Sequence, residues 1–125
     1  MNKKLIGQCH CGKNKFEVNA EPVFQFVCYC LSCRVLNSGH LNGMAFHDEA
    51  LQKATETKTY SYPGGSGKPI ILHFCPVCSV GLYAYPTAHE NIVVVRANTL
   101  LNAEFKPQKT MYPESAFEWD EVKIL

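Results

Sequence analysis

The chain has 125 residues, of which 46% are apolar and 18% are charged, and its formal net charge is +1. This length predicts a single domain, residues 1–125, and the ordinary composition excludes a disordered chain. The near-neutral charge excludes the basic surface with which proteins hold nucleic acid, so we expect no nucleic-acid partner.

Neither a signal peptide nor a membrane span is expected. Near the start only Leu5 and Ile6 stand where a signal peptide needs a longer apolar stretch, and the longest β-branched apolar run is residues 92–95. We therefore expect a cytoplasmic protein without a membrane partner. In that reducing compartment, seven cysteines, an odd number, favour metal binding over disulfides.

Strand patterns dominate the chain. Apolar and polar residues alternate over two segments, a third is rich in Thr and Tyr, and two more are short apolar runs of strand length. In chain order these predicted strands are residues 15–18, 23–27, 57–62, 70–74 and 92–95. Turns are expected at residues 20–22 and in the glycine-rich segment 63–67, which suits a hairpin or the rim of a substrate site.

Two short helices are also predicted, over residues 31–37 and 48–53, the second with Asp48 as a possible N-cap. The last twenty or so residues carry Phe105, Tyr112, Phe117 and Trp119 and are too aromatic for a loose tail, so we expect them to pack on the domain. The pattern as a whole predicts a mainly β fold with one or two short helices.

The cysteines fall into three groups at chelating spacing. Cys-x-Cys places both thiols on one face of a strand, and Cys-x-x-Cys closes a tight turn of the kind found in zinc sites. The groups are Cys9 and Cys11; Cys28, Cys30 and Cys33; and Cys75 and Cys78.

Seven ligands divide naturally into four and three. Four thiolates would close a structural site, and three would leave one position for water or substrate. Two pairs make a set of four, which leaves Cys28, Cys30 and Cys33 as the open triad. The alternative is one four-cysteine site with three spare thiols buried as small apolar groups. Thiolate ligands admit iron as well as zinc, and zinc is favoured because no iron–sulfur spacing is present.

The cysteine groups and their neighbours resemble a known family. Gly7-Gln8-Cys9-His10-Cys11-Gly12, then Cys28, Cys30 and Cys33 with Arg34, then Phe74 with Cys75 and Cys78 are similar to the glutathione-dependent formaldehyde-activating enzyme family, also called the centromere protein V domain family. The resemblance runs from about residue 7 to residue 119. The sequence departs from the family pattern at Tyr29, where members commonly have His, and at segments 79–80, 97–101 and 109–110.

This resemblance implies a β-tent of antiparallel sheets with zinc-binding knuckles. It also implies two zinc ions. The ligands of the structural ion would be Cys9, Cys11, Cys75 and Cys78, and those of the catalytic ion would be Cys28, Cys30 and Cys33. The implied activity is that of a carbon–sulfur lyase, in which a thiol such as glutathione adds to formaldehyde to give S-hydroxymethylglutathione and the reverse step cleaves the adduct.

Two residues beside the triad are candidates for a role in function. Arg34 follows Cys33 directly, so it is a candidate to bind a substrate carboxylate or offset thiolate charge, the alternative being a surface arginine in a weak ion pair. Tyr29 alternates away from Cys28 and Cys30 and is interpreted as a packing residue. The rival to the enzyme is a non-catalytic zinc module that binds a partner protein, which needs no open zinc position.

Overall fold

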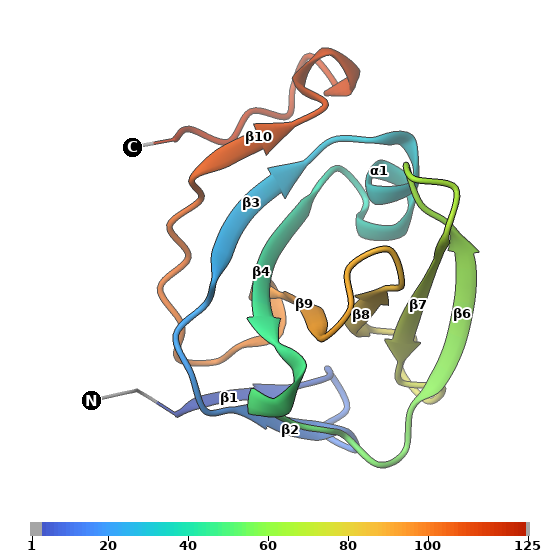
Figure 1. Cartoon of the computed structure of the whole chain (residues 1–125), viewed down its shortest axis with the longest axis vertical. Helices are drawn as coiled ribbons and strands as arrows, with labels where there is room; N and C mark the ends of the chain where they lie inside the picture. Colours follow the sequence, from blue (N-terminus) through green and yellow to red (C-terminus); the bar gives the residue numbers. More distant parts are fainter. Residues whose placement is uncertain (1–3, 125) are drawn as a thin grey trace.

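The computed structural model of the chain describes residues 4–124 and contains two β-sheets (Figure 1). The smaller sheet is antiparallel, in the order β1-β2-β5, with strands Leu5–Gln8, Lys15–Val18 and Leu51–Gln52. The larger sheet has the order β10-β3-β4-β9-β8-β7-β6. Its strands are β3 (Phe24–Cys28), β4 (Leu41–His47), β6 (Lys58–Pro63), β7 (Pro69–Phe74), β8 (Gly81–Pro86), β9 (Ile92–Arg96) and β10 (Lys109–Met111).

Every named strand pair is antiparallel except the pair formed by β10 and β3, which is parallel. The segment that leads into β10 is held to β3 by a side chain: Oε1 of Gln25 accepts a hydrogen bond from the Lys106 amide at 2.8 Å. The expectation of a mainly β fold is confirmed, and each of the five predicted strands is present within one or two residues of its expected bounds.

The helix predicted over residues 31–37 is present as α1 (Leu31–Asn37), which ends at Ser38 with a left-handed φ of 57°. The helix predicted over residues 48–53 is wrong beyond its first turn. Residues Asp48–Ala50 form a single 3-10 turn, η1, and Leu51 then extends into β5, where it pairs with Val18 and becomes buried. Pairing of β5 with β2 satisfies backbone hydrogen bonds and also buries the Leu51 side chain, whereas a short isolated helix is only marginally stable. Two further 3-10 turns are η2 (Ala97–Thr99) and η3 (Pro113–Ser115).

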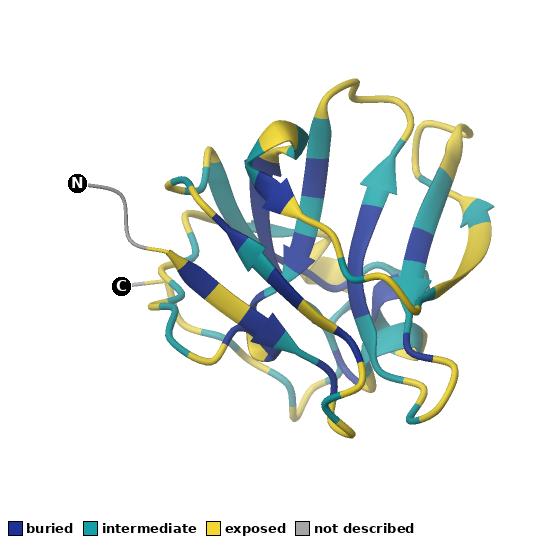
Figure 2. Cartoon of the chain, turned by 90° about the horizontal axis from the view of Figure 1, so that it is seen from below, coloured by how far each residue is buried: buried dark blue, intermediate teal, exposed yellow. Residues whose placement is uncertain are grey.

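The hydrophobic core lies between the two sheets. β2 contributes Phe16, whose ring meets Tyr83 of β8 edge-on with centroids 5.3 Å apart. Alternate residues of β4 and β9 face the same core, because successive strand side chains point to opposite faces. Alternation of buried and exposed positions is visible along β1, next to the N-terminus, in Figure 2. The core residues of β4 and β9 are Met44, Phe46, Val93 and Val95.

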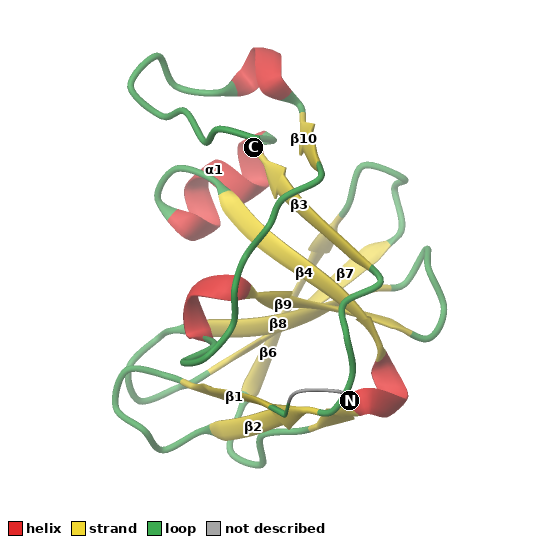
Figure 3. Ribbon diagram, turned by 90° about the vertical axis from the view of Figure 1, so that its left-hand side faces the viewer, coloured by secondary structure: helices red, strands yellow, loops and turns green. Residues whose placement is uncertain are grey.

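The C-terminal segment packs on the domain beside α1, at the end of the molecule away from the small sheet (Figure 3). The Val122 amide donates a hydrogen bond to the Tyr29 hydroxyl at 2.9 Å, and Asp120 contacts His40 at 2.8 Å. Phe117 stacks on Trp119 with ring centroids 4.6 Å apart. The segment packs on the domain as predicted, with Phe105 against the core and Phe117 against Arg34, whereas Trp119 itself is 80% exposed. Among residues 4–124, no helix is both long and apolar enough to cross a membrane.

Candidate metal centres and the adjoining cavity

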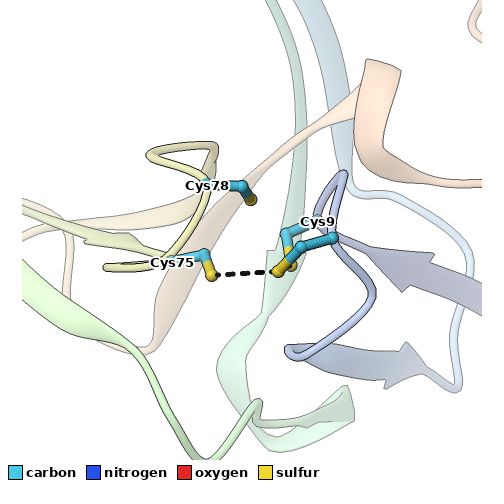
Figure 4. A group of neighbouring side chains, drawn as sticks. Cys9, Cys75 and Cys78 are labelled. Atoms are coloured by element: carbon cyan, nitrogen blue, oxygen red, sulfur yellow. Dashed lines mark hydrogen bonds between the residues drawn. The ribbon is translucent and has the colours of Figure 1, made fainter.

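Two turns bring four cysteines together in what we call the four-cysteine cluster. Cys9 and Cys11 lie in the turn after β1, and Cys75 and Cys78 in the turn between β7 and β8, with all four sulfur atoms within 4.8 Å of one another. The Sγ atom of Cys11 is 3.6 Å from that of Cys9 and 3.7 Å from that of Cys75. Zinc with sulfur ligands at about 2.3 Å places the corners of a regular tetrahedron about 3.8 Å apart, so this cluster fits zinc. Figure 4 shows the thiols of Cys9, Cys75 and Cys78 directed toward a common point.

Backbone hydrogen bonds hold both turns in this form. The Gly12 amide donates to the Cys9 carbonyl at 3.1 Å with Gly12 at a φ of 79°, and the Ser79 amide donates to the Cys75 carbonyl at 2.8 Å. Cys9 and Cys11 therefore meet because of a turn, and not because of the strand alternation expected from their spacing. Backbone amides, first that of Cys78, lower the pKa of Cys75 to about 6, which favours the thiolate that a metal requires.

The remaining three cysteines form the cysteine triad beside β3, which lies near the opposite edge of the large sheet from β7. Cys28 ends β3, Cys30 precedes the first residue of α1 and Cys33 lies in the first turn, with their sulfur atoms within 4.8 Å of one another. A hydrogen bond from the Cys33 thiol lowers the pKa of Cys28 to about 6, and the same bond raises the pKa of Cys33. All seven cysteines are free thiols, so the structure groups them as four and three with donor sets suited to zinc.

The triad opens into a cavity of about 480 Å³ on the face of the large sheet opposite the core. The register of the strands explains why the sheet has a cavity here, because it aligns small side chains in one row. Ala45, Val94 and Ala84 stand side by side on three central strands, whereas the larger Phe24 and Leu72 flank this row. The cavity walls are mostly apolar and include Phe26, Ile70, Ile92 and Met111. Gly64, Gly65 and Ser66 of the loop between β6 and β7 also line it, which confirms the glycine-rich segment as a hairpin and as part of a cavity rim.

Arg96 is the arginine that lines this cavity together with the three triad cysteines. It ends β9, its Nε donates to Asn37 Oδ1 at 2.6 Å, and its positive charge interacts with Cys33 and Tyr62. Burial lowers its pKa, but guanidinium begins so high that it stays charged at neutral pH. Burial, and then the charge of Cys33, raises the pKa of Tyr62 to about 12, so its hydroxyl remains protonated and able to donate a hydrogen bond.

Arg34 has a different place. Its guanidinium lies 3.9 Å from the centre of the Phe117 ring, and it is not one of the described residues that line the cavity. Adjacency to Cys33 in sequence suggested Arg34, while Arg96 comes from a strand 63 positions later and gives no local signal of its role. Tyr29 is 3% exposed and accepts the Val122 hydrogen bond, which confirms its interpretation as a packing residue.

Two facing sheets, with a compact cluster of four thiols between turns and a triad of thiols in a cavity, define a β domain suited to holding metal ions. The sequence model of the family described as glutathione-dependent formaldehyde-activating enzyme matches residues 4–115, and the chain belongs to this family. The resemblance found from the cysteine groups is thereby confirmed.

Among solved structures, a Rhodobacter sphaeroides protein known from its crystal structure is similar, with a TM-score of 0.62 and 18% sequence identity. The match covers 87% of this chain and 100% of that chain, and at this identity it shows a shared fold. No functionally curated protein matches the sequence.

Proposed function

We propose that the protein is a zinc-dependent carbon–sulfur lyase of the formaldehyde-activating type, acting on a thiol–aldehyde adduct such as S-hydroxymethylglutathione. The observation that carries this proposal is the difference between the two cysteine sets. Cys28, Cys30 and Cys33 line a cavity large enough for a small molecule, whereas none of the other four cysteines lines it. A set of three thiolates beside such a cavity suits a metal with an open position for substrate.

The proposed reaction joins or separates one carbon–sulfur bond. In the synthetic direction, the sulfur of the thiol forms a bond to the aldehyde carbon, and the π electron pair of the carbonyl group moves to its oxygen. The thiol loses one proton and the carbonyl oxygen gains one, so that it becomes a hydroxyl. Cleavage is the reverse. When bound to the triad, zinc would supply the Lewis acidity that keeps the substrate sulfur as thiolate at neutral pH.

Two polar side chains complete the proposed site. Three thiolates would outnumber the two positive charges of zinc, so a substrate thiolate would add to a centre that is already negative. The guanidinium of Arg96, which is half-buried beside the triad, would offset part of that charge. The hydroxyl of Tyr62, which faces the same cavity, is a hydrogen-bond donor for the oxygen of the adduct.

A second candidate is a non-catalytic zinc module that binds a partner protein. One observation favours it: Leu31 and Val35, four residues apart on one face of α1, are 68% and 72% exposed. Such exposed apolar side chains on a helix suit a protein contact.

Reduced glutathione is expected to bind cobalt-substituted protein and change its thiolate-to-metal charge-transfer bands. S-methylglutathione, which cannot form a thiolate, is the matched control and is expected to leave the bands unchanged. Cys30→Ser is expected to abolish the change, because it removes one ligand of the open site. If no low-molecular-weight thiol alters the spectrum, the lyase proposal fails and the binding module is the better account.

A further inference from the structure

The walls of the cavity are more apolar than a one-carbon aldehyde needs. Its volume of about 480 Å³ is the volume that about sixteen water molecules occupy in liquid water, which is far larger than a formaldehyde molecule. Across the sheet, the row of Ala45, Val94 and Ala84 forms an apolar floor whose neighbours on β3 and β7 are large and apolar. Water on this floor would be poorly bonded, so a ligand with an apolar group gains affinity by displacing it.

The charged groups that line the cavity are not balanced in sign. Its other polar lining side chains, apart from the thiols, are neutral hydroxyls and an imidazole: Tyr62, Ser66, Thr87, His89 and Tyr112. Arg96 lies with the triad, while Lys68, which is exposed, belongs to the glycine-rich rim. Among the described lining residues there is no Asp or Glu, so the walls offer no carboxylate to an ammonium group. Glutathione carries an ammonium, two carboxylates and two amides, and none of these finds a partner on the floor.

We propose that the substrate is the adduct of a thiol with an aldehyde that carries an apolar chain or ring, and that this group lies on the floor formed by Ala45, Val94 and Ala84. The aldehyde carbon is then next to the sulfur at the triad, and the polar part of the thiol extends toward the rim at Lys68. This inference rests on the proposed function for the reaction itself, while recognition of the apolar group depends only on side chains of this chain.

Binding of straight-chain alcohols, which have neither thiol nor carbonyl, tests the apolar floor separately from the chemistry. We expect affinity of the zinc-loaded protein to rise from 1-propanol to 1-hexanol by about fourfold per methylene, which corresponds to about 0.8 kcal/mol. Methyl NMR signals of Ile70, Ile92 and Val94 are expected to shift in the same titration. No binding of 1-hexanol, or equal affinities along the series, would overturn the inference.

Two substitutions locate the binding. Ala84→Leu fills the floor and is expected to lower 1-hexanol affinity at least tenfold, whereas Ala20→Leu, in a turn away from this cavity, is the matched control. Because a larger side chain at a buried position can disturb folding, Val94→Thr provides a second test at nearly equal volume. Its added hydroxyl is expected to weaken 1-hexanol binding by about fivefold or more. Unchanged affinity in a folded Val94→Thr protein would contradict the assignment.

Failure of the lyase proposal gives a different pattern. Suppose that alcohols bind with the expected chain-length dependence but no thiol changes the cobalt spectrum. The apolar binding site is then supported and the lyase proposal is rejected. If alcohols bind and thiols also change the cobalt spectrum, the cleavage rates of two adducts of the same thiol are compared, one with hexanal and one with formaldehyde. We expect the hexanal adduct to be cleaved faster. A preference for the formaldehyde adduct would overturn the inference and leave the lyase proposal standing.

Discussion

Cys75→Ser is expected to unfold the protein, whereas Cys30→Ser is expected to leave it folded. Cys75 is fully buried, and its cluster joins turns whose cysteines, Cys11 and Cys75, are 64 positions apart. A structural zinc is worth about 10–16 kcal/mol in small peptides, while a whole domain is stable by about 5–15 kcal/mol. Loss of zinc from the four-cysteine cluster, after removal of one ligand, is therefore expected to cost as much as the whole free energy of unfolding of the domain.

Circular dichroism during heating, together with the yield of soluble protein, measures this difference. Val77→Ser is the matched control, because Val77 is in the same turn as Cys75 but 62% exposed. It is expected to melt close to the unmodified protein. Equal melting temperatures for Cys75→Ser and Cys30→Ser would contradict the assignment of a structural and an open site.

Arg96→Met is expected to weaken binding of reduced glutathione to the cobalt-substituted protein by at least about tenfold, since a hydrogen bond or contact with a charged group contributes about 1.5–3 kcal/mol. Met keeps an apolar stem of similar reach but removes the half-buried positive charge that interacts with Cys33 and Tyr62. The thiolate ligand, which adds negative charge to the triad, then lacks its nearby cation. Titration followed by the charge-transfer bands gives the dissociation constant.

Arg34→Met is the comparison, and its effect is expected to be smaller because Arg34 stacks on Phe117 and lies outside the cavity lining. Melting temperature and the cobalt spectrum without thiol show whether each variant keeps its fold and its metal site. If Arg34→Met proves the more damaging of the two, the arginine beside the triad in sequence is the functional one, and the role proposed for Arg96 is wrong.

The sequence predicts the local features of this fold better than its long-range ones. The alternation around Val18 and Phe26 and the β-branched run around Val94 indicate strands because each of these signals is local to its segment. β4 gives a weaker signal, because Gly43, Met44, Ala45 and Phe46 are buried on both faces, do not alternate, and lack the β-branched residues that mark residues 92–95. β10 is short and held by pairing with β3, which only tertiary structure supplies.

The candidate site shows the same division. Ligand spacing reveals that the cysteines bind metal, because chelation within a turn is a local property. The partnership of Cys11 with Cys75 followed from resemblance to the family, and spacing alone left it open. Arg96 and Tyr62 could not be found from the sequence at all, because their place beside Cys33 depends on the register of β9 and β6 within the large sheet.

Zinc content per chain tests the central claim, one closed and one open thiolate site, most directly. Reduced protein saturated with zinc and freed of excess ion is expected to contain two zinc ions per chain by elemental analysis, because the structure groups the thiols as four and three. In a variant with Cys28, Cys30 and Cys33 all replaced by serine, the expected content falls to one ion and the protein stays folded. One zinc per chain in the saturated unmodified protein would contradict the two-site account.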